Sequence, residues 1–182
     1  HGQDDGDSFD VYARRYYSTG SALGSEFRVN SHTSSQEWIS SVALSNYSHF
    51  AISWTSNGQD GDGDGVYAQA FDSTGSEVND EIAVNTTTGG HQSHSSIAID
   101  NSGNYTVGWM SVGQDGNDAG VYYRYFGVSG YTSPEFKANS TTAGAQNYPA
   151  IVISPQTTIG VSWASDDQDG DGFGIYTGLF FD

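Results

Sequence analysis

The chain has 182 residues, with 5 lysine and arginine residues against 22 aspartate and glutamate residues, which gives a formal net charge of −17 at pH 7. A surface of this charge repels DNA, RNA and anionic lipid, which argues against nucleic acid as a partner. No apolar run approaches the roughly 20 residues that a membrane-spanning helix requires, so we expect no membrane insertion. The chain has no cysteine, which excludes disulfides and thiolate metal sites, and its 14% aromatic residues supply enough apolar surface for folding.

A motif repeats along the chain with a constant spacing. The segment NGQDGDGDGVYAQAF at 57–71 is its clearest copy, and the Val-Tyr pair within it recurs as Val-Tyr or Ile-Tyr at steps of 55, 55 and 54 residues. A tryptophan and a Glu-Phe or Glu-Ile pair recur at the same steps. The three in-phase sets are Val11, Val66, Val121 and Ile175; Trp54, Trp109 and Trp163; and Glu26, Glu81 and Glu135. Three independent markers with one spacing indicate a tandem repeat.

Short runs with strand character follow one another within each repeat. In chain order they are 11–17, 26–30, 41–45, 50–54, 66–71, 81–85, 96–100, 105–109, 121–126, 135–139, 150–154, 158–163 and 175–181. In the first tryptophan run, Phe50, Ile52 and Trp54 alternate with small or polar residues, and the two later tryptophan runs do the same, so we expect this face to be buried. Turns rich in Gly, Ser, Asn and Asp separate the runs, and no segment has a sustained 3.6-residue period, so we expect essentially no helix.

Four short antiparallel strands in one repeat match the size of a β-propeller blade. The sequence therefore predicts an all-β, β-propeller-like array of tandem four-stranded antiparallel blades, with three units and one extra strand. The expected units are 1–56, 57–111 and 112–165, and 166–182 is expected to be the first strand of a fourth repeat or a swapped strand. Three units are too few for a ring of about four to eight blades. We therefore expect the strand at 175–181 to complete a blade with another copy of the chain or with further repeats of a longer protein.

Three segments of the repeat resemble a known type of repeat. Trp54–Asp72 corresponds to the pattern W-x-S-x-G-Q-D-G-x-G-x-G-V-Y-A-Q-x-F-D, Glu81–Thr87 to E-F-x-V-N-x-T-T, and Gln146–Val152 to Q-x-x-P-x-V-A. Over nearly the whole chain, these motifs resemble a family of secreted bacterial repeats. The resemblance implies propeller-like arrays in large surface, adhesin-like or calcium-rich exoproteins, and hence an extracellular or cell-surface location. Members of this kind usually have no assigned activity, so the resemblance implies location better than function.

An acidic loop precedes each Val-Tyr or Ile-Tyr pair. In its fullest copy, Asp60, Asp62 and Asp64 alternate with glycine, so that three carboxylates could converge on one hard cation. The pattern resembles the start of an EF-hand loop and the calcium loops of integrin-type propellers, which implies calcium as a cofactor. The other copies contain fewer ligands: Asp115 and Asn117, Asp169 and Asp171, and Asp5 and Asp7. The alternative is that Gln-Asp-Gly forms a tight turn, in which Asp side chains accept backbone N–H groups and Gly takes a positive φ.

Two further sets of polar residues have both a structural and a functional interpretation. A glutamine precedes each acidic loop, at Gln3, Gln59, Gln114 and Gln168, where it either satisfies backbone groups between blades or contacts a ligand. Four N-x-S/T sequons are candidates for glycosylation, at Asn46, Asn85, Asn104 and Asn139. Asn85 and Asn139 are equivalent in the repeat, which favours a structural turn role for both.

The repetition of every acidic cluster argues against catalysis, because the acid pair of a glycosidase should occur once, in one cleft. We therefore expect that the chain is not an enzyme. The leading hypothesis is a non-enzymatic, extracellular structural or adhesive module, which forms part of a fibre or surface layer and is stabilised by cations. One alternative is a carbohydrate-binding, lectin-like propeller, whose exposed aromatic rings would stack on glycans. Another is a fragment of a propeller hydrolase whose catalytic blades lie outside this sequence.

Overall fold

The computed structural model describes residues 9–155 and 157–180 of the chain. These residues form thirteen β-strands and contain no helix, so the described part has no helix that could cross a membrane. The strands are β1 (Tyr12–Tyr16), β2 (Ala22–Arg28), β3 (Glu37–Leu44), β4 (Phe50–Asn57), β5 (Asp64–Phe71), β6 (Glu77–Ala83), β7 (Gln92–Ile99), β8 (Tyr105–Val112), β9 (Ala119–Phe126), β10 (Phe136–Lys137), β11 (Gln146–Ile153), β12 (Ile159–Asp166) and β13 (Phe173–Phe180). The expected all-β architecture is confirmed.

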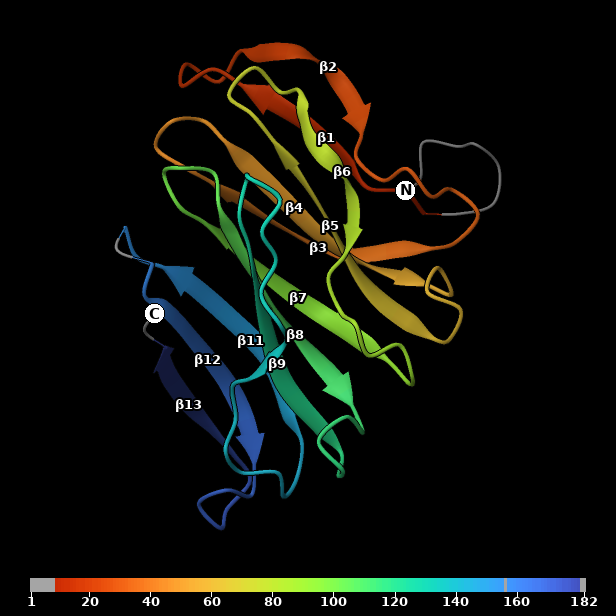
Figure 1. Ribbon diagram of the computed structural model, residues 1–182, viewed down its shortest axis with the longest axis vertical. Helices are drawn as coiled ribbons and strands as arrows, with labels where there is room; N and C mark the ends of the chain where they lie inside the picture. The colour runs from red at the N-terminus through yellow and green to blue at the C-terminus, as the bar shows by residue number, and fades with distance from the viewer. Residues whose placement is uncertain (1–8, 156, 181–182) are drawn as a thin grey trace.

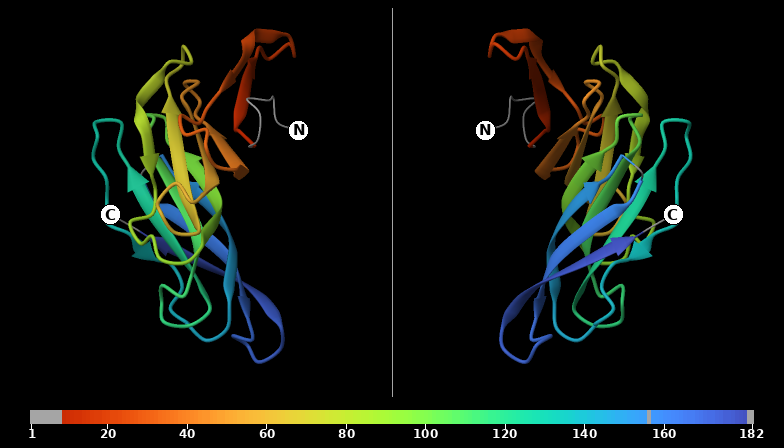
Figure 2. Two further views of the ribbon diagram at one scale, coloured as in Figure 1. Left: turned by 90° about the vertical axis from the view of Figure 1, so that its right-hand side faces the viewer. Right: turned by 90° about the vertical axis from the view of Figure 1, so that its left-hand side faces the viewer.

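The strands form four antiparallel sheets, which we name in chain order. Sheet A is β1–β2, sheet B is β3–β4–β5–β6, sheet C is β7–β8–β9–β10, and sheet D is β11–β12–β13. Neighbouring strands of a sheet follow each other in the chain, so each sheet is a simple meander. The sheets succeed one another along the long axis of the molecule, from sheet A at the top of Figure 1 to sheet D at the bottom, and Figure 2 shows them from the side as successive twisted layers. Successive meandering sheets of this kind have the architecture of propeller blades.

The sheets do not coincide with the repeat units expected from the sequence. The unit 57–111 contains β5 and β6 of sheet B followed by β7 and β8 of sheet C. Each unit therefore combines the third and fourth strands of one sheet with the first and second strands of the next. The boundary between two units falls in the hairpin that joins the second strand of a sheet to the third. That hairpin is paired along its whole length in sheet B, from Phe50 opposite Phe71 to Asn57 opposite Asp64. A periodic sequence determines the length of the repeat but not the point at which one sheet ends.

The strand that was expected to lack a blade belongs to sheet D. β13 pairs with β12 along its length, with Ile159 opposite Phe180 and Asp166 opposite Phe173. The segment therefore joins a sheet within this chain, and the expected completion of its blade by another copy or by further repeats stays a prediction. Among the described residues, sheet D lacks a fourth strand. Sheet A consists there of two strands, which are equivalent to the third and fourth strands of sheets B and C.

The first strand of sheets B, C and D contains a β-bulge at the same position of the repeat. Its pairing register with the second strand shifts there in all three sheets. One residue other than glycine has a positive φ at each bulge. These residues are Ile39, His94 and Tyr148, with φ values of 51°, 54° and 52°. Because a bulge increases the local twist of a strand, its recurrence gives the three sheets a similar inner edge.

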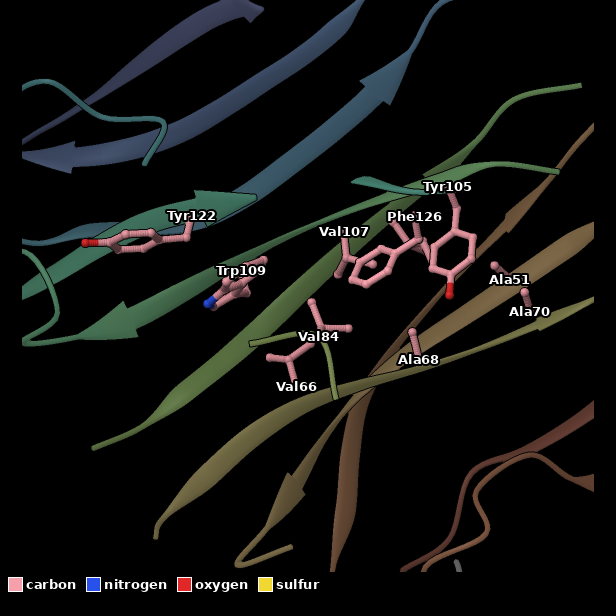
Figure 3. Packing of buried hydrophobic residues seen from close by; sticks show 11 residues of the cluster. Ala51, Val66, Ala68, Ala70, Val84, Tyr105, Val107, Trp109, Tyr122 and Phe126 are labelled. Carbon is pink, nitrogen blue, oxygen red and sulfur yellow. The ribbon is translucent and has the colours of Figure 1, made fainter. Parts of the chain in front are cut away.

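The core lies between successive sheets. Trp109 of β8 is fully buried, and it belongs to one cluster with Val66 and Ala68 of β5 in the preceding sheet (Figure 3). The same arrangement recurs at the other two interfaces. Val11 clusters there with Trp54, and Val121 with Trp163. The expected burial of the tryptophan face is confirmed, and the residues that bury it come from the sheet before.

We predict that Trp109→Ala lowers the free energy of unfolding by about 3–5 kcal/mol, as is typical when a buried large aromatic side chain is truncated. Chemical denaturation followed by circular dichroism measures the change. Leu44→Ala is the control, because Leu44 lies on β3 with an exposed side chain, and its truncation should change stability by less than about 0.5 kcal/mol. A loss below about 1 kcal/mol for Trp109→Ala would contradict a core built between sheets.

Candidate functional site

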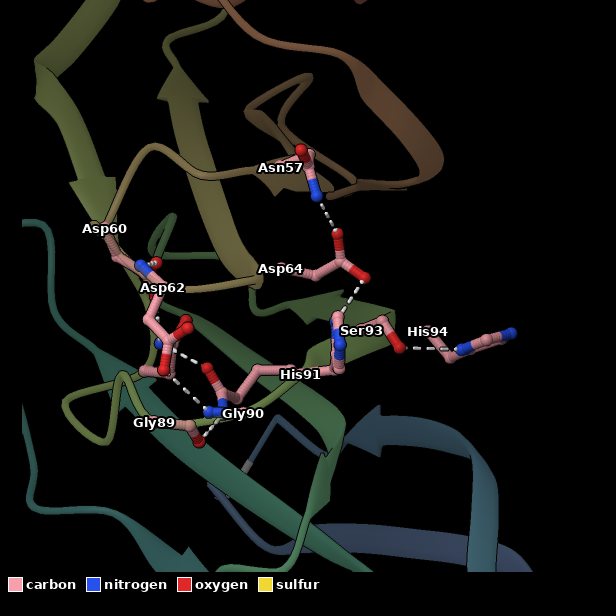
Figure 4. Close-up of polar contacts among 11 residues, drawn as sticks. Asn57, Asp60, Asp62, Asp64, Gly89, Gly90, His91, Ser93 and His94 are labelled. Carbon is pink, nitrogen blue, oxygen red and sulfur yellow. Dashed lines mark hydrogen bonds and ion pairs between the residues drawn. The ribbon is translucent and has the colours of Figure 1, made fainter.

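The acidic loops lie between the second and third strands of the sheets. In sheet B, the loop joins β4 to β5, and its carboxylates point to different partners (Figure 4). Asp60 Oδ1 accepts a hydrogen bond from the backbone N–H of Asp62 at 3.2 Å, and Asp62 Oδ2 accepts one from the backbone N–H of Gly90 at 3.3 Å. Asp60 therefore binds a backbone donor within the loop, and Asp62 binds one in the segment that precedes β7.

Asp64, the third carboxylate, has two side-chain partners. Asn57 Nδ2 donates to its Oδ1 at 2.9 Å, and His91 Nδ1 lies 3.0 Å from its Oδ2. The three carboxylates do not converge, and the described part of the chain contains no group of three or more His, Cys, Asp or Glu side chains that could hold a metal ion. This geometry favours the turn interpretation of the loop over a preformed calcium site.

Two other copies of the loop form the same turn. Asp115 Oδ1 accepts the backbone N–H of Asn117 at 3.2 Å, and Asp169 Oδ1 accepts that of Asp171 at 3.4 Å. The glycine after the first aspartate is left-handed in all three loops, a conformation that other residues adopt with strain. These glycines are Gly61, Gly116 and Gly170, with φ values of 97°, 92° and 92°. Asp5 and Asp7 lie outside the described residues.

We predict that the melting temperature is the same in EDTA and in millimolar calcium. Binding of one ion by all three carboxylates would require Asp62 to leave Gly90 and Asp64 to leave Asn57, which opposes the gain from the ion. Differential scanning fluorimetry of the wild type and of Asp64→Asn makes the comparison. A calcium-dependent rise that Asp64→Asn abolishes would show that the loop rearranges into a calcium site, since a ligand that binds only the folded state stabilises it.

A set of hydrogen bonds among Gln59, Glu81 and Ser31, which we call the latch, links sheet B to sheet A. Gln59 Nε2 donates to Glu81 Oε1 at 2.7 Å. Glu81 Oε2 accepts the backbone N–H of Ser31 at 2.6 Å and its hydroxyl at 3.0 Å. Because Ser31 follows β2 and Glu81 lies on β6, the carboxylate links the fourth strands of two successive sheets.

The same latch ties sheet C to sheet B. Gln114 Nε2 donates to Glu135 Oε2 at 2.9 Å, and Glu135 accepts the backbone N–H of Thr86. The backbone N–H and the hydroxyl of Thr87 also donate to Glu135, each at 3.3 Å. Sequence reasoning found both halves of the latch, since its Gln and Glu recur in phase, but missed that they pair. The glutamines orient a carboxylate, and the carboxylate satisfies the backbone.

The latch holds Glu135 in its ionised form. Burial raises the pKa of the Glu135 carboxyl, but hydrogen bonds from Thr86, Gln114 and Thr87 outweigh burial and leave this pKa below its ordinary value of 4.5. A carboxyl whose pKa is lower in the folded than in the unfolded state contributes stability above the unfolded pKa. That contribution is lost as the pH falls through the folded pKa.

We predict that Glu135→Gln destabilises the protein at pH 7 and makes its stability less sensitive to acid. The wild type and the variant should converge as the pH falls below 4.5, where the native carboxyl also becomes protonated. Thermal melting between pH 7 and pH 3 measures this, with Glu77→Gln, an exposed residue of β6, as the control. Parallel curves for the wild type and Glu135→Gln would contradict a role for the ionised latch.

The repeat-equivalent sequon asparagines are structural. Asn85 is 4% exposed and Asn139 is 2% exposed. In both, Oδ1 accepts the backbone N–H of the valine that begins the Val-Tyr pair, at 2.7 and 2.8 Å, and Nδ2 donates to the carbonyl two residues ahead. A buried, donating Nδ2 leaves no room for a glycan in the folded protein. Asn46 is exposed, whereas Asn104 is half-buried and its Nδ2 donates to Asp100.

A groove with aromatic walls lies between sheets C and D, with a volume of about 590 Å³. The ring centroid of Tyr123 lies 5.4 Å from that of Phe136 and 4.7 Å from that of Phe180. Tyr125 and Tyr131 form a second ring pair at 6.2 Å. The lining also includes the hydroxyl residues Ser133 and Thr157 and the apolar residues Ile159 and Leu179. Five aromatic rings therefore surround one opening.

The aromatic groove departs from the repeat. The corresponding groove between sheets B and C is smaller, at about 300 Å³. Ala68 and Ala70 stand 55 residues before Tyr123 and Tyr125, so the wall that sheet C contributes has no aromatic counterpart in sheet B. Sequence reasoning treated the run 121–126 as one more strand. The signal that could have found the groove was this replacement of Ala-x-Ala by Tyr-x-Tyr in one copy.

No protein-family model matches the chain, and no curated protein sequence matches it. Among solved structures, a thermostable family-43 glycoside hydrolase aligns with a TM-score of 0.50 and 8% identity, over 87% of this chain and 60% of that chain. The endo-arabinase from Bacteroides thetaiotaomicron VPI-5482 aligns with a TM-score of 0.48 and 11% identity, over 84% and 58% of the two chains. A fucose lectin from Kordia zhangzhouensis gives a TM-score of 0.39 and 13% identity, over 79% and 99%. The chain spans about three fifths of the length of these hydrolases, and likeness at such identities shows the fold alone.

The comparison corrects one expectation from the sequence. The expectation that the chain is not an enzyme is wrong. Its sheets share the fold of a family-43 glycoside hydrolase, so an enzymatic role is not excluded. The reason for the error is that a glycosidase needs only one pair of carboxylates in one cleft. Repetition of the other acidic residues therefore carries no information about whether such a pair exists in the whole protein.

Proposed function

We propose that this chain is part of an extracellular propeller-type protein that binds carbohydrate in the aromatic groove between sheets C and D. The observation that carries the proposal is the gathering of five aromatic rings at this one interface. An aromatic ring offers an apolar face to the C–H side of a pyranose, and Tyr, Ser and Thr hydroxyls offer hydrogen bonds to its hydroxyl groups. The extracellular location follows the resemblance of the repeat to secreted proteins.

The groove has rings both at its rim and in its wall. Tyr131 is 58% exposed and Phe136 is 43% exposed, so both can contact a ligand that enters from solvent. Tyr123 is buried and packs on Phe136, which holds that ring in place. The volume of about 590 Å³ lies within the range of roughly 300–1,000 Å³ that small-molecule sites occupy.

The lining favours a neutral saccharide. All nine lining residues are uncharged, so the groove offers no counter-charge to an acidic or a basic sugar. The net charge of −17 adds a repulsive field for anionic glycans. Stacking and hydroxyl hydrogen bonds are therefore the interactions that would select the ligand.

We predict that the chain binds neutral oligosaccharides and that Tyr131→Ala and Phe136→Ala each weaken this binding by about threefold to tenfold, which corresponds to roughly 0.5–1.5 kcal/mol for one aromatic contact. A glycan array identifies the ligand, and isothermal titration calorimetry measures the affinities. Tyr47→Ala, an exposed tyrosine in the turn between β3 and β4, is the control and should bind as the wild type does. The proposal would be refuted if no saccharide bound, or if both groove variants bound the saccharide with the affinity of the wild type.

The same saccharides, together with arabinan, should be assayed for released reducing sugar, because the fold is shared with glycoside hydrolases. Binding that depends on Tyr131 and Phe136 supports the groove whether or not the sugar is cleaved. Cleavage that both groove variants retain in full, without groove-dependent binding, would assign the function to another site.

A further inference from the structure

A second groove, polar in its lining, lies between sheets A and B. It has a volume of about 580 Å³ and is lined by residues 28–31 at the end of β2, by Gln59, and by residues of β5 and β6. Its charged side chains are one cation, Arg28, and three carboxylates, which are Glu77, Asp80 and Glu81. The groove therefore has an excess of negative charge.

One position of the third strand explains why there is room for this groove. At steps of 55 residues it is occupied by Arg14, Gln69 and Arg124 in sheets A, B and C. Arg124 Nε donates to the carbonyl of Ser133 at 2.7 Å, and Arg14 makes the equivalent bond in sheet A at 3.2 Å. Gln69 Nε2 donates to the equivalent carbonyl of Asn79 at 3.1 Å. Sheet B thus keeps this bond but has no guanidinium at the position.

The guanidinium of Arg124 makes a second bond, which reaches the preceding sheet. Its Nη1 donates to the carbonyl of Val84 at 3.0 Å. The equivalent of Val84 in sheet A is Val29, which lines the groove. Gln69 does not replace this bond, because both hydrogen bonds of its Nε2 go to carbonyls of sheet B, and no described side chain donates to the Val29 carbonyl. The groove is therefore open because β5 carries a glutamine where β9 carries an arginine.

Tyr67 of β5 adds a further polar group to the lining. Its side chain is buried, and its hydroxyl has no hydrogen-bond partner among the described residues. Burial, and then the charges of Asp60 and Glu81, raise the pKa of Tyr67 to about 12, so its hydroxyl is neutral at pH 7 and its oxygen can accept a hydrogen bond. Because a buried polar group without a partner costs free energy, this hydroxyl favours a polar ligand over an apolar one.

Two carboxylates at the groove are available to a cation. Both oxygens of Glu81 accept hydrogen bonds within the latch. Glu77 and Asp80 are exposed, and neither side chain has a partner among the described residues. Asp80 stands where sheet C has Pro134, so this carboxylate belongs to the interface of sheets A and B alone. A guanidinium can pair with a carboxylate and donate to a carbonyl at the same time, because its N–H groups form a rigid, planar fork.

We propose that the groove between sheets A and B binds the guanidinium group of a ligand. The group takes the place that Arg124 occupies at the next interface, donates to the Val29 carbonyl and pairs with Asp80. The chain itself shows that this part of the repeat accepts a guanidinium, since Arg124 is bound there by two backbone carbonyls. The net charge of −17 attracts a cationic ligand. This proposal is independent of the carbohydrate groove, which lies between sheets C and D.

An NMR titration of the isotope-labelled chain tests the proposal, with N-acetylarginine amide as the probe and N-acetyllysine amide as its matched comparator. The arginine probe should bind with a millimolar dissociation constant and shift the backbone amide signals of Val29 and Asn30. The lysine probe should bind about tenfold more weakly, because an ammonium is a point charge without the planar fork. The proposal would be overturned if the arginine probe did not bind at millimolar concentration, or if the two probes bound equally well.

Two variants place the site in this groove. Gln69→Arg supplies the guanidinium from the protein, as Arg124 does in sheet C, so it should abolish binding of the arginine probe without lowering the melting temperature. Asp80→Asn should weaken binding about threefold, as expected for the loss of an exposed ion pair. Asp118→Asn is the matched control, because it removes the same charge from an exposed position in the loop before β9. Undiminished binding in Gln69→Arg would overturn the proposal, as would equal weakening by Asp80→Asn and Asp118→Asn, which would show attraction by net charge alone.

Two further probes distinguish the sources of the guanidinium group. The first is methylguanidinium, and the second is a pentapeptide with one arginine between two glycines on each side. Tighter binding of the pentapeptide would assign the ligand to an arginine side chain of a polypeptide, and tighter binding of methylguanidinium would assign it to a small molecule. Either result supports the site, provided that Gln69→Arg abolishes the binding of both probes. Binding of both probes that Gln69→Arg leaves intact would place the guanidinium elsewhere on the protein and overturn the proposal.

Discussion

Every sheet in this chain depends on one contact, in which the valine of a third strand packs on the tryptophan of the next sheet. A sheet of three or four short strands has no interior of its own, so its apolar face stays in water until a neighbour covers it. Trp54, Trp109 and Trp163 are all buried, and each belongs to a cluster that includes the in-phase valine of the sheet before. The apolar contacts that stabilise the protein therefore lie between the sheets.

The polar residues of the repeat hold this packing in register. Glu81 and Glu135 join fourth strands of neighbouring sheets, while Asn85 and Asn139 bind the valine that covers the next tryptophan. A carboxylate that accepts backbone N–H groups has its charge stabilised by them, so it can remain ionised when half-buried. Part of the acidity of this chain is thus structural, although a high negative charge suggests a surface property at first.

Features that recur at the repeat period serve the array, and features that depart from it are candidates for function. The turns of the acidic loops, the latches and the bulges recur, and each has a structural account. The aromatic groove occurs at one interface, because Tyr123 and Tyr125 replace Ala68 and Ala70. The same fold in a family-43 glycoside hydrolase shows that such sheets also form the framework of enzymes, so function has to be argued from these departures.

The sequence by itself determined the all-β class, the repeat length and the buried tryptophan face, because alternation and spacing are local properties of the chain. Only the tertiary structure decided where each sheet begins, because the connections within sheets and between them are both short and polar. It also decided that Gln59, in the loop before β5, bonds to Glu81 of β6. The directions of the loop carboxylates, which turn to separate partners, and the contact of Tyr123 with Phe180 were likewise decided by the tertiary structure. In each case the direction of a side chain depends on a neighbouring strand or sheet, and no local pattern specifies which neighbour that will be.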